Sequence, residues 1–150
     1  MKNISGAASL EVKIYNKLIG SLTKKGLKVN AFKILNTALF IVSKKTGYSF
    51  SYLVWQIFKK AFTRIEVRTV SIKGKSFLVP FTISKNRRLF LVTKWLLKAI
   101  EDLKKQRSLV DSIVEELFLL VTSKKSKVLE YKEKNYKAAL ANKSNLHYRW

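Results

Sequence analysis

The sequence has 150 residues, and 47% of them are hydrophobic, enough for one domain with an apolar core. Its 31 Lys and Arg residues against 9 Asp and Glu residues give a formal net charge of +22, which indicates a polyanionic partner, nucleic acid first and an anionic membrane second. The lack of Cys excludes disulfides, thiolate metal sites and cysteine nucleophiles, and the apolar runs are far too short for a membrane-spanning helix.

The first 64 residues show the 3.6-residue period of amphipathic helices. A first helix is predicted over residues 9–23, followed by a basic turn around Gly26. A second helix is predicted over about residues 29–44, because cations and then Gly47 follow it, as is usual at a helix end. Ser49 or Ser51 is expected to cap a third helix that reaches Ala61.

The apolar period then changes from 3.6 to 2 residues, which predicts a β-hairpin over residues 65–83. Lys73, Gly74 and Lys75 are expected to form its turn, so that the tip of the hairpin is cationic. Pro80 has no N–H to donate, which indicates that the second strand lies at an edge.

A fourth helix is predicted after Ser84, with Arg87 and Arg88 in its first turn. Two cations at the positive end of a helix are unfavourable, so we expect a group outside the chain to compensate for them. A fifth helix is expected to begin with a capping box at Ser108 and Asp111.

The segment from Ser126 onward is helix-prone but mostly polar, and we expect it to lie over the domain as a sixth helix. Two i,i+4 ion pairs are expected on it, Glu130 with Lys134 and Glu133 with Lys137. The fold class is therefore mainly α: one domain over residues 1–150, with about six helices and a protruding two-stranded β-hairpin arm. The helical body spans residues 9–64 and 85–142, and residues 143–150 form a tail.

The chain is poor in catalytic side chains. Its single His, His147, is the fourth residue from the C-terminal end. The paired carboxylates are expected on solvated helix surfaces beside Lys rather than in a cleft, and they are Glu101 with Asp102, Glu115 with Glu116, and Glu130 with Glu133. No glycine-rich phosphate loop or nucleophile elbow is present. We therefore expect no enzyme, no catalytic or metal-binding residues, no cofactor and no small-molecule substrate.

The distribution of positive charge is the remaining chemical signal. Any single Lys more often only keeps a surface soluble, but solubility does not require a net charge of +22. The candidate phosphate-binding groups are Lys24, Lys25 and Lys28 at the basic turn, Arg68, Lys73 and Lys75 on the hairpin, Arg87 and Arg88 at a helix start, and Lys143 and Arg149 in the tail. Burial of Trp150 in its own chain and stacking of Trp150 on a base both remain open.

The order of several short segments resembles that of the small-subunit ribosomal protein seven family, a bacterial-type protein of the subunit head. The segments are Ile65-Glu66-Val67-Arg68 through Gly74 to Val79-Pro80, the pair Arg87-Arg88, Lys94-Trp95, the turn at Lys25, Gly26 and Lys28, and the ending Ala141-Asn142-Lys143 with His147-Tyr148-Arg149-Trp150. This resemblance covers almost the whole chain, although more loosely in the last two helices.

The resemblance implies a helical domain whose hairpin arm helps to bind the 3′ major domain of small-subunit rRNA. It also implies a role in organising the head beside neighbouring head proteins, with the arm near the exit-site tRNA and the mRNA path. The RNA-facing residues that it implies are Lys25, Lys28, Arg68, Lys75, Arg87, Arg88, Lys94 and the tail from Lys143 through His147, Tyr148 and Arg149 to Trp150. Their cations would neutralise phosphates at an RNA junction recognised mainly by its shape.

The chain departs from the family pattern in three places. Val70 and Ser71 replace paired arginines, Phe62 and Thr63 replace an arginine-proline pair, and about eight residues stand where the family has a basic extension. We therefore expect the arm to touch RNA less, and protein more, than in the family.

The resemblance also bears on location. Residues 9–23 match the family's first helix, so we expect them to belong to the domain and not to a presequence. Lys outnumbers Arg by 25 to 6, a bias typical of AT-rich genomes. This predicts a mitochondrion-encoded protein of the mitochondrial matrix, with a plastid or a bacterial cytoplasm as alternatives.

Two other functions share part of these features. A DNA-compacting nucleoid protein would have the same charge but would not need the hairpin-to-tail pattern. A membrane-active protein would leave the apolar faces of its helices free, whereas five helices and a hairpin can bury one another's faces.

Overall fold

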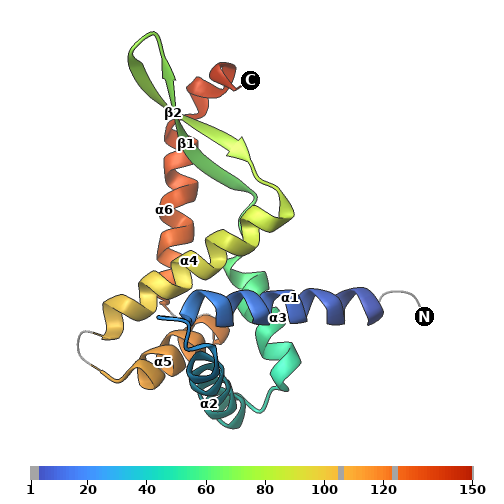
Figure 1. Cartoon of the computed structure of the whole chain (residues 1–150). Helices are drawn as coiled ribbons and strands as arrows, with labels where there is room; N and C mark the ends of the chain where they lie inside the picture. The colour runs from blue at the N-terminus through green and yellow to red at the C-terminus, as the bar shows by residue number, and fades with distance from the viewer. Residues whose placement is uncertain (1–3, 105–106, 123–124, 150) are drawn as a thin grey trace.

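The computed structural model describes residues 4–104, 107–122 and 125–149. Six α-helices, two strands and one 3-10 helix follow one another in the described chain (Figure 1). Their bounds are α1 Ile4–Leu22, α2 Lys28–Thr46, α3 Phe50–Ala61, β1 Ile65–Ile72, β2 Lys75–Thr82, α4 Lys85–Lys104, α5 Leu109–Val121, α6 Lys127–Ala141 and the 3-10 helix η1 Lys143–Tyr148. The prediction of a mainly helical fold with a protruding hairpin is confirmed.

One cluster of buried apolar side chains receives residues from every α-helix of the described chain. Leu39, Leu53, Ile113 and Leu120 are fully buried at its centre, with Val128 contributed by α6. These residues form the apolar faces that the sequence shows, because each helix turns its hydrophobic side toward its neighbours.

The helix ends agree with most of the predicted signals. Ser49 caps α3 by accepting the N–H of Tyr52 at 3.4 Å, and Ser108 caps α5 by accepting the N–H of Asp111 at 3.2 Å. Gly47 follows α2 with φ of 73°, in the left-handed region that favours glycine. The first helix, however, begins at Ile4 and not at residue 9.

The hairpin has a regular antiparallel register from Ile65 opposite Thr82 to Ile72 opposite Lys75. Its turn has two residues, Lys73 with φ of 48° and Gly74 with φ of 78°. Two positive φ values are what a two-residue turn needs to match the twist of its strands. Lys75 therefore begins the second strand instead of belonging to the turn.

Helix α6 and the segment after it connect the body to the hairpin (Figure 1). The Lys132 ammonium donates to the carbonyl of Lys60 at 2.7 Å, and the Asn135 amide donates to the carbonyl of Ile65, also at 2.7 Å. Asn145, in η1, donates to the carbonyl of Leu78 at 3.0 Å. Helix α6 and η1 thus do more than cover the domain, because they support the hairpin at its base and near the middle of its second strand.

Two predictions about acidic residues need correction. Glu116 is fully buried, and its Oε1 accepts the Ser126 hydroxyl at 2.7 Å and the N–H of Val128 at 3.0 Å. Its place on a solvated surface was therefore wrongly predicted: the carboxylate caps the start of α6, where free N–H groups attract negative charge.

The predicted ion pairs of α6 are half right. Glu133 and Lys137 pair at 2.8 Å. Lys134 instead places its ammonium 6.0 Å from the centre of the Tyr131 ring, and no ion pair between it and Glu130 forms in the described part of the chain.

Candidate nucleic-acid interface

The basic turn between α1 and α2 holds three of the predicted cations. Lys25 and Gly26 both have positive φ, 52° and 75°, and the N–H of Lys28 donates to the carbonyl of Gly26 at 2.8 Å. The tight turn leaves the side chains of Lys24, Lys25 and Lys28 exposed. It lies in the helical body, away from the hairpin (Figure 1).

The hairpin tip carries two further predicted cations. Lys73 and Lys75 flank Gly74 and are exposed. Because the tip projects beyond the helices, their ammonium groups are accessible to a partner that approaches from outside the body (Figure 1).

The base of the hairpin is joined to α4 through one carboxylate. Glu66 accepts two hydrogen bonds from Arg87, at 3.0 Å from Nε and 2.6 Å from Nη2, and two from Arg68 at 3.2 Å. The hydrogen bonds from Arg87 lower the pKa of Glu66, and the same contact raises the pKa of Arg87. The expectation that a group outside the chain compensates for Arg87 is therefore wrong, because Glu66 does so within it.

Arg88 also contacts its own chain. Its Nε donates to the carbonyl of Ile83 at 3.0 Å, and its guanidinium lies 5.1 Å from the centre of the Phe62 ring. Phe62 and the buried Thr63, the two departures from the family pattern, thus face inward at the hairpin base. The half-buried Arg88 helps to hold this junction and offers less of its charge to a partner than Lys73 or Lys75.

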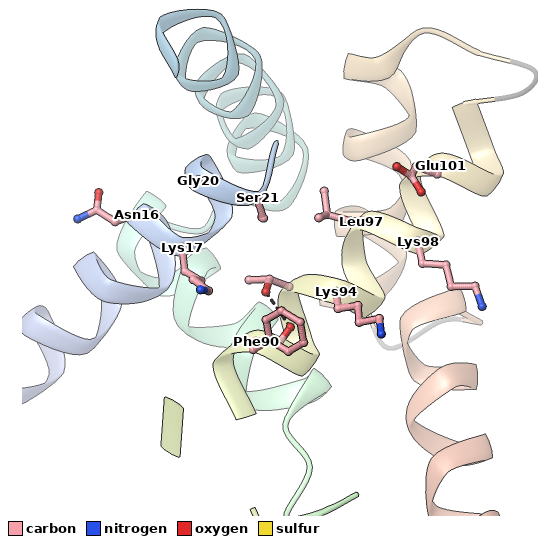
Figure 2. Close-up of a pocket in the computed structure, with 10 residues that line it drawn as sticks. Asn16, Lys17, Gly20, Ser21, Phe90, Lys94, Leu97, Lys98 and Glu101 are labelled. Carbon is pink, nitrogen blue, oxygen red and sulfur yellow. Dashed lines mark hydrogen bonds between the residues drawn. The ribbon is translucent and has the colours of Figure 1, made fainter. Parts of the chain in front are cut away.

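Lys94 lies in a groove between α1 and α4 that the sequence alone does not reveal (Figure 2). Lys17 from α1 and Lys98 from α4 line the same groove, together with Phe90. The i,i+4 spacing of Lys94 and Lys98 was a signal that they share a face of α4, but only the packing of the two helices adds Lys17.

This groove connects the basic turn with the hairpin base. A second hollow, lined by Lys24, shares Ser21, Leu97 and Glu101 with it. At the other end, the Lys17 ammonium lies 5.9 Å and the Arg87 guanidinium 4.8 Å from the centre of the Phe90 ring. We name this set the basic track: Lys24, Lys17, Lys94, Lys98, Arg87 and Arg68.

The tail folds against the hairpin. Tyr148 packs on Phe77 of β2, with ring centres 4.8 Å apart. The centres of the Tyr148 and His147 rings lie 3.9 Å apart. The His147 Nδ1 lies 2.8 Å from the carbonyl of Ser144. Lys143 and Arg149 are exposed beside them, whereas Trp150 lies outside the described residues.

The predicted residues therefore form two groups. The hairpin, its base and the tail hold Arg68, Lys73, Lys75, Arg87, Arg88 and residues 143–149. The basic turn is remote from them, and the groove with Lys17 and Lys98, which were missed, joins the two.

The described residues give no sign of other chemistry. No group of three His, Asp or Glu gathers there to hold a metal ion. None of the described helices has the length and apolar character needed to cross a bilayer.

Comparison with known proteins gives a consistent match. The family model described as ribosomal protein S7p/S5e matches residues 2–143. The small ribosomal subunit protein uS7 of Leptospira biflexa is 28% identical over 149 residues, which cover 99% of this chain and 94% of that protein. The protein of the same name from Sulfurovum is 30% identical, over 92% of this chain and 88% of that protein. That from Geobacter metallireducens is 27% identical, over 92% of this chain and 87% of that protein.

Proposed function

This chain belongs to the ribosomal protein S7p/S5e family and is a structural, non-enzymatic constituent of the small ribosomal subunit, and from this we propose that it binds the 3′ major domain of small-subunit rRNA and nucleates assembly of the head. The observation that carries the proposal is the continuity of the basic track. Phe90 links Lys17 with Arg87, and Glu66 links Arg87 with Arg68, so cations follow one path from the helical body to the hairpin.

A path of this kind suits an RNA backbone. Lys and Arg neutralise phosphates without reading bases, so a folded RNA junction is selected by the positions of its phosphates. Glu66 sets the positions of two guanidiniums, which leaves less side-chain freedom to lose on binding. Lys94 and Lys98 line the middle of the track on a rigid helix.

The hairpin tip and the tail extend this proposal. We propose that Lys73 and Lys75 approach the exit-site tRNA and the mRNA path, and that Lys143, His147 and Arg149 contact rRNA beside the hairpin. Support comes from their exposure and from the packing of Tyr148 on Phe77, which holds the tail against the arm.

The salt dependence of binding tests the track directly. The affinity for an RNA fragment of the 3′ major domain is measured at several salt concentrations for the unchanged protein and for the double variant Lys94→Ala with Lys98→Ala. Loss of two phosphate contacts is expected to make the negative slope of log affinity against log salt shallower by about 1.5. Lys59→Ala, which removes an exposed cation of α3, serves as the control.

An unchanged slope in the double variant would contradict the placement of RNA on the track. Equal affinity for duplex DNA of the same length would contradict specific recognition of the rRNA domain and would favour DNA compaction instead.

We also propose that the protein is encoded and works in a mitochondrion. The support is compositional, since Lys outnumbers Arg by 25 to 6. The relatives reported above are bacterial, so the bacterial cytoplasm is the second candidate. Mapping the reading frame to an organellar genome would support the proposal, and mapping it to a bacterial chromosome would refute it.

A further inference from the structure

The far end of the helical body exposes a group of apolar and aromatic side chains that the basic track does not use. Phe40 is 59% exposed, Val12 57% and Phe32 46%, with Phe50 and the half-buried Tyr15 among them. We name these five residues the aromatic face. Large exposed apolar side chains that gather in one place mark contact sites more often than scattered ones do.

Contacts among four of these residues, and the helix spacing of Phe40, indicate that they form one surface. The ring of Tyr15, on α1, meets Phe32 of α2 at 6.2 Å and Phe50 of α3 at 5.5 Å, both edge to face. The Tyr15 hydroxyl donates to Asn36, which lies between Phe32 and Phe40 at four-residue spacing on the same side of α2. A hollow beside Tyr15 is lined by Val12, Phe50 and Glu11.

This surface is remote from the RNA contacts proposed for the hairpin and the tail. Helices α2 and α3 lie at the end of the molecule opposite the hairpin and the tail (Figure 1). A partner on the aromatic face and RNA along the hairpin would therefore not exclude each other.

The charge around the face favours a partner with carboxylates. The Lys44 ammonium lies 4.7 Å from the centre of the Phe40 ring, and Lys33 is exposed on the same helix. Glu11 is the only acidic residue before Glu66 in the sequence, and its carboxylate accepts the Ser51 hydroxyl. The chain thus supplies Lys33 and Lys44 to this surface against the single carboxylate of Glu11, and this excess of positive charge is a condition for electrostatic complementarity with an acidic partner.

The ring arrangement favours protein over RNA. Stacking of bases needs accessible ring faces. Here Tyr15 is held edge to face by two neighbours, and Lys44 covers one face of Phe40. The first Arg of the sequence is Arg64, so the guanidiniums that often accompany stacked bases are missing from these helices.

We propose that the aromatic face is the docking site for another protein of the small subunit, through a segment that presents apolar side chains flanked by Asp or Glu. The inference rests on membership of the small subunit and not on which rRNA domain the basic track binds. Its failure would therefore leave the proposed RNA contacts untouched.

Photo-crosslinking inside assembled small subunits tests the proposal. p-Benzoylphenylalanine replaces Phe40 in one protein and Leu27 in the control, because Leu27 is 57% exposed but lines the hollow that holds Lys24 and not the hollow beside Tyr15. At position 40 a bulky aromatic group replaces an exposed aromatic one, and at position 27 it replaces an exposed apolar one, so we expect both proteins to keep the fold. The expected result is a crosslink from position 40, and not from position 27, to a protein peptide in which apolar residues alternate with Asp or Glu.

Other crosslinks would overturn the proposal. A crosslink from position 40 to rRNA would assign the face to base stacking, and one to a second copy of the chain would assign it to self-association. No crosslink, or equal crosslinks from both positions, would mean that the face holds no specific protein partner.

A second measurement uses subunit composition. The double variant Phe32→Ser with Phe40→Ser is assembled into subunits and compared with Leu27→Ser. The protein crosslinked at position 40 is expected to fall at least about tenfold in occupancy in the double variant, as for the loss of interface anchors, while the chain itself stays bound. Unchanged occupancy would overturn the proposal.

Discussion

Replacing Tyr148 with Ala is expected to loosen the outer half of the hairpin and to leave the helical body intact. Tyr148 packs on Phe77 of β2 with ring centres 4.8 Å apart and planes tilted by 30°. Asn145, three residues earlier, donates to the carbonyl of Leu78. The hairpin sheet has two strands, and an isolated pair of strands is marginally stable in water, so it depends on contacts of this kind.

The size of the effect follows from these contacts. An aromatic pair contributes about 0.5–1.5 kcal/mol beyond the area it buries. Fraying of the tail after loss of the Tyr148 ring would also weaken the Asn145 hydrogen bond, which contributes about 1 kcal/mol. A local loss of about 1–2 kcal/mol raises the open fraction of the outer hairpin roughly 5- to 30-fold.

Amide hydrogen exchange followed by NMR measures this opening residue by residue. Amides of residues 69–78 are expected to exchange roughly 5- to 30-fold faster in Tyr148→Ala, because protection tracks the open fraction. Ser144→Ala changes an exposed side chain of the same 3-10 helix and is expected to leave exchange unchanged. Equal protection of these amides in Tyr148→Ala and in the unchanged protein would refute the supporting role of the tail.

Three further predictions concern the acidic residues. Arg87→Gln removes the largest cause of the lowered pKa of Glu66, so an NMR titration should show that pKa rise toward its ordinary value of 4.5, and no movement would argue against the contact. In the unchanged protein, the Glu66 charge contributes stability that is complete above about pH 4.5 and is lost as the pH falls through the lower folded-state pKa. The free energy of unfolding in urea should therefore fall more in that acid range for the unchanged protein than for Glu66→Gln, and equal losses would contradict this contribution. Glu116→Ala leaves the buried N–H of Val128 without its acceptor and should cost about 3 kcal/mol in urea unfolding, against less than about 1 kcal/mol for the exposed ion pair lost in Glu115→Ala; similar losses in both variants would refute the capping role.

The regular elements could be predicted because their signals are local. Apolar spacing identified the helices, while Ser49 and Ser108 marked two helix starts through side chains that accept nearby N–H groups. Lys73 and Gly74 marked the hairpin turn, because the twist of the strands requires positive φ there. These features depend on residues fewer than five positions apart.

The contacts of the candidate site could not be predicted in the same way. Glu66 and Arg87 are 21 residues apart and meet only because the hairpin returns to the body before α4 begins. In the sequence, Glu66 is an acidic residue of a predicted strand, and Arg87 is an unfavourable cation at a predicted helix start. The fold turns that local conflict into an ion pair at the hairpin base.

Glu116 shows the same limit for a buried group. It lies between Ile113 and Leu120 on the inner side of α5, where a carboxylate is unfavourable without partners. Its partners, Ser126 and Val128, belong to the start of the next helix, and the capping pattern crosses from one helix to another. A sequence period cannot show a cap of that kind.

The groove between α1 and α4 also required the fold. Lys94 was identified through the family resemblance, whereas Lys17 and Lys98 were missed among many lysines. The packing of the two helices makes one cationic surface of residues that are more than 70 positions apart in sequence.

Crosslinking within purified small subunits shows which segments of the chain contact rRNA. Subunits are washed at moderate salt and irradiated with ultraviolet light, and the chain's peptides that carry rRNA nucleotides are identified. We expect that the protein stays with the subunit and that rRNA of the 3′ major domain crosslinks to peptides of the basic track, the hairpin and the tail. Release of the protein into the wash, or rRNA crosslinks confined to α2 and α3, would contradict it.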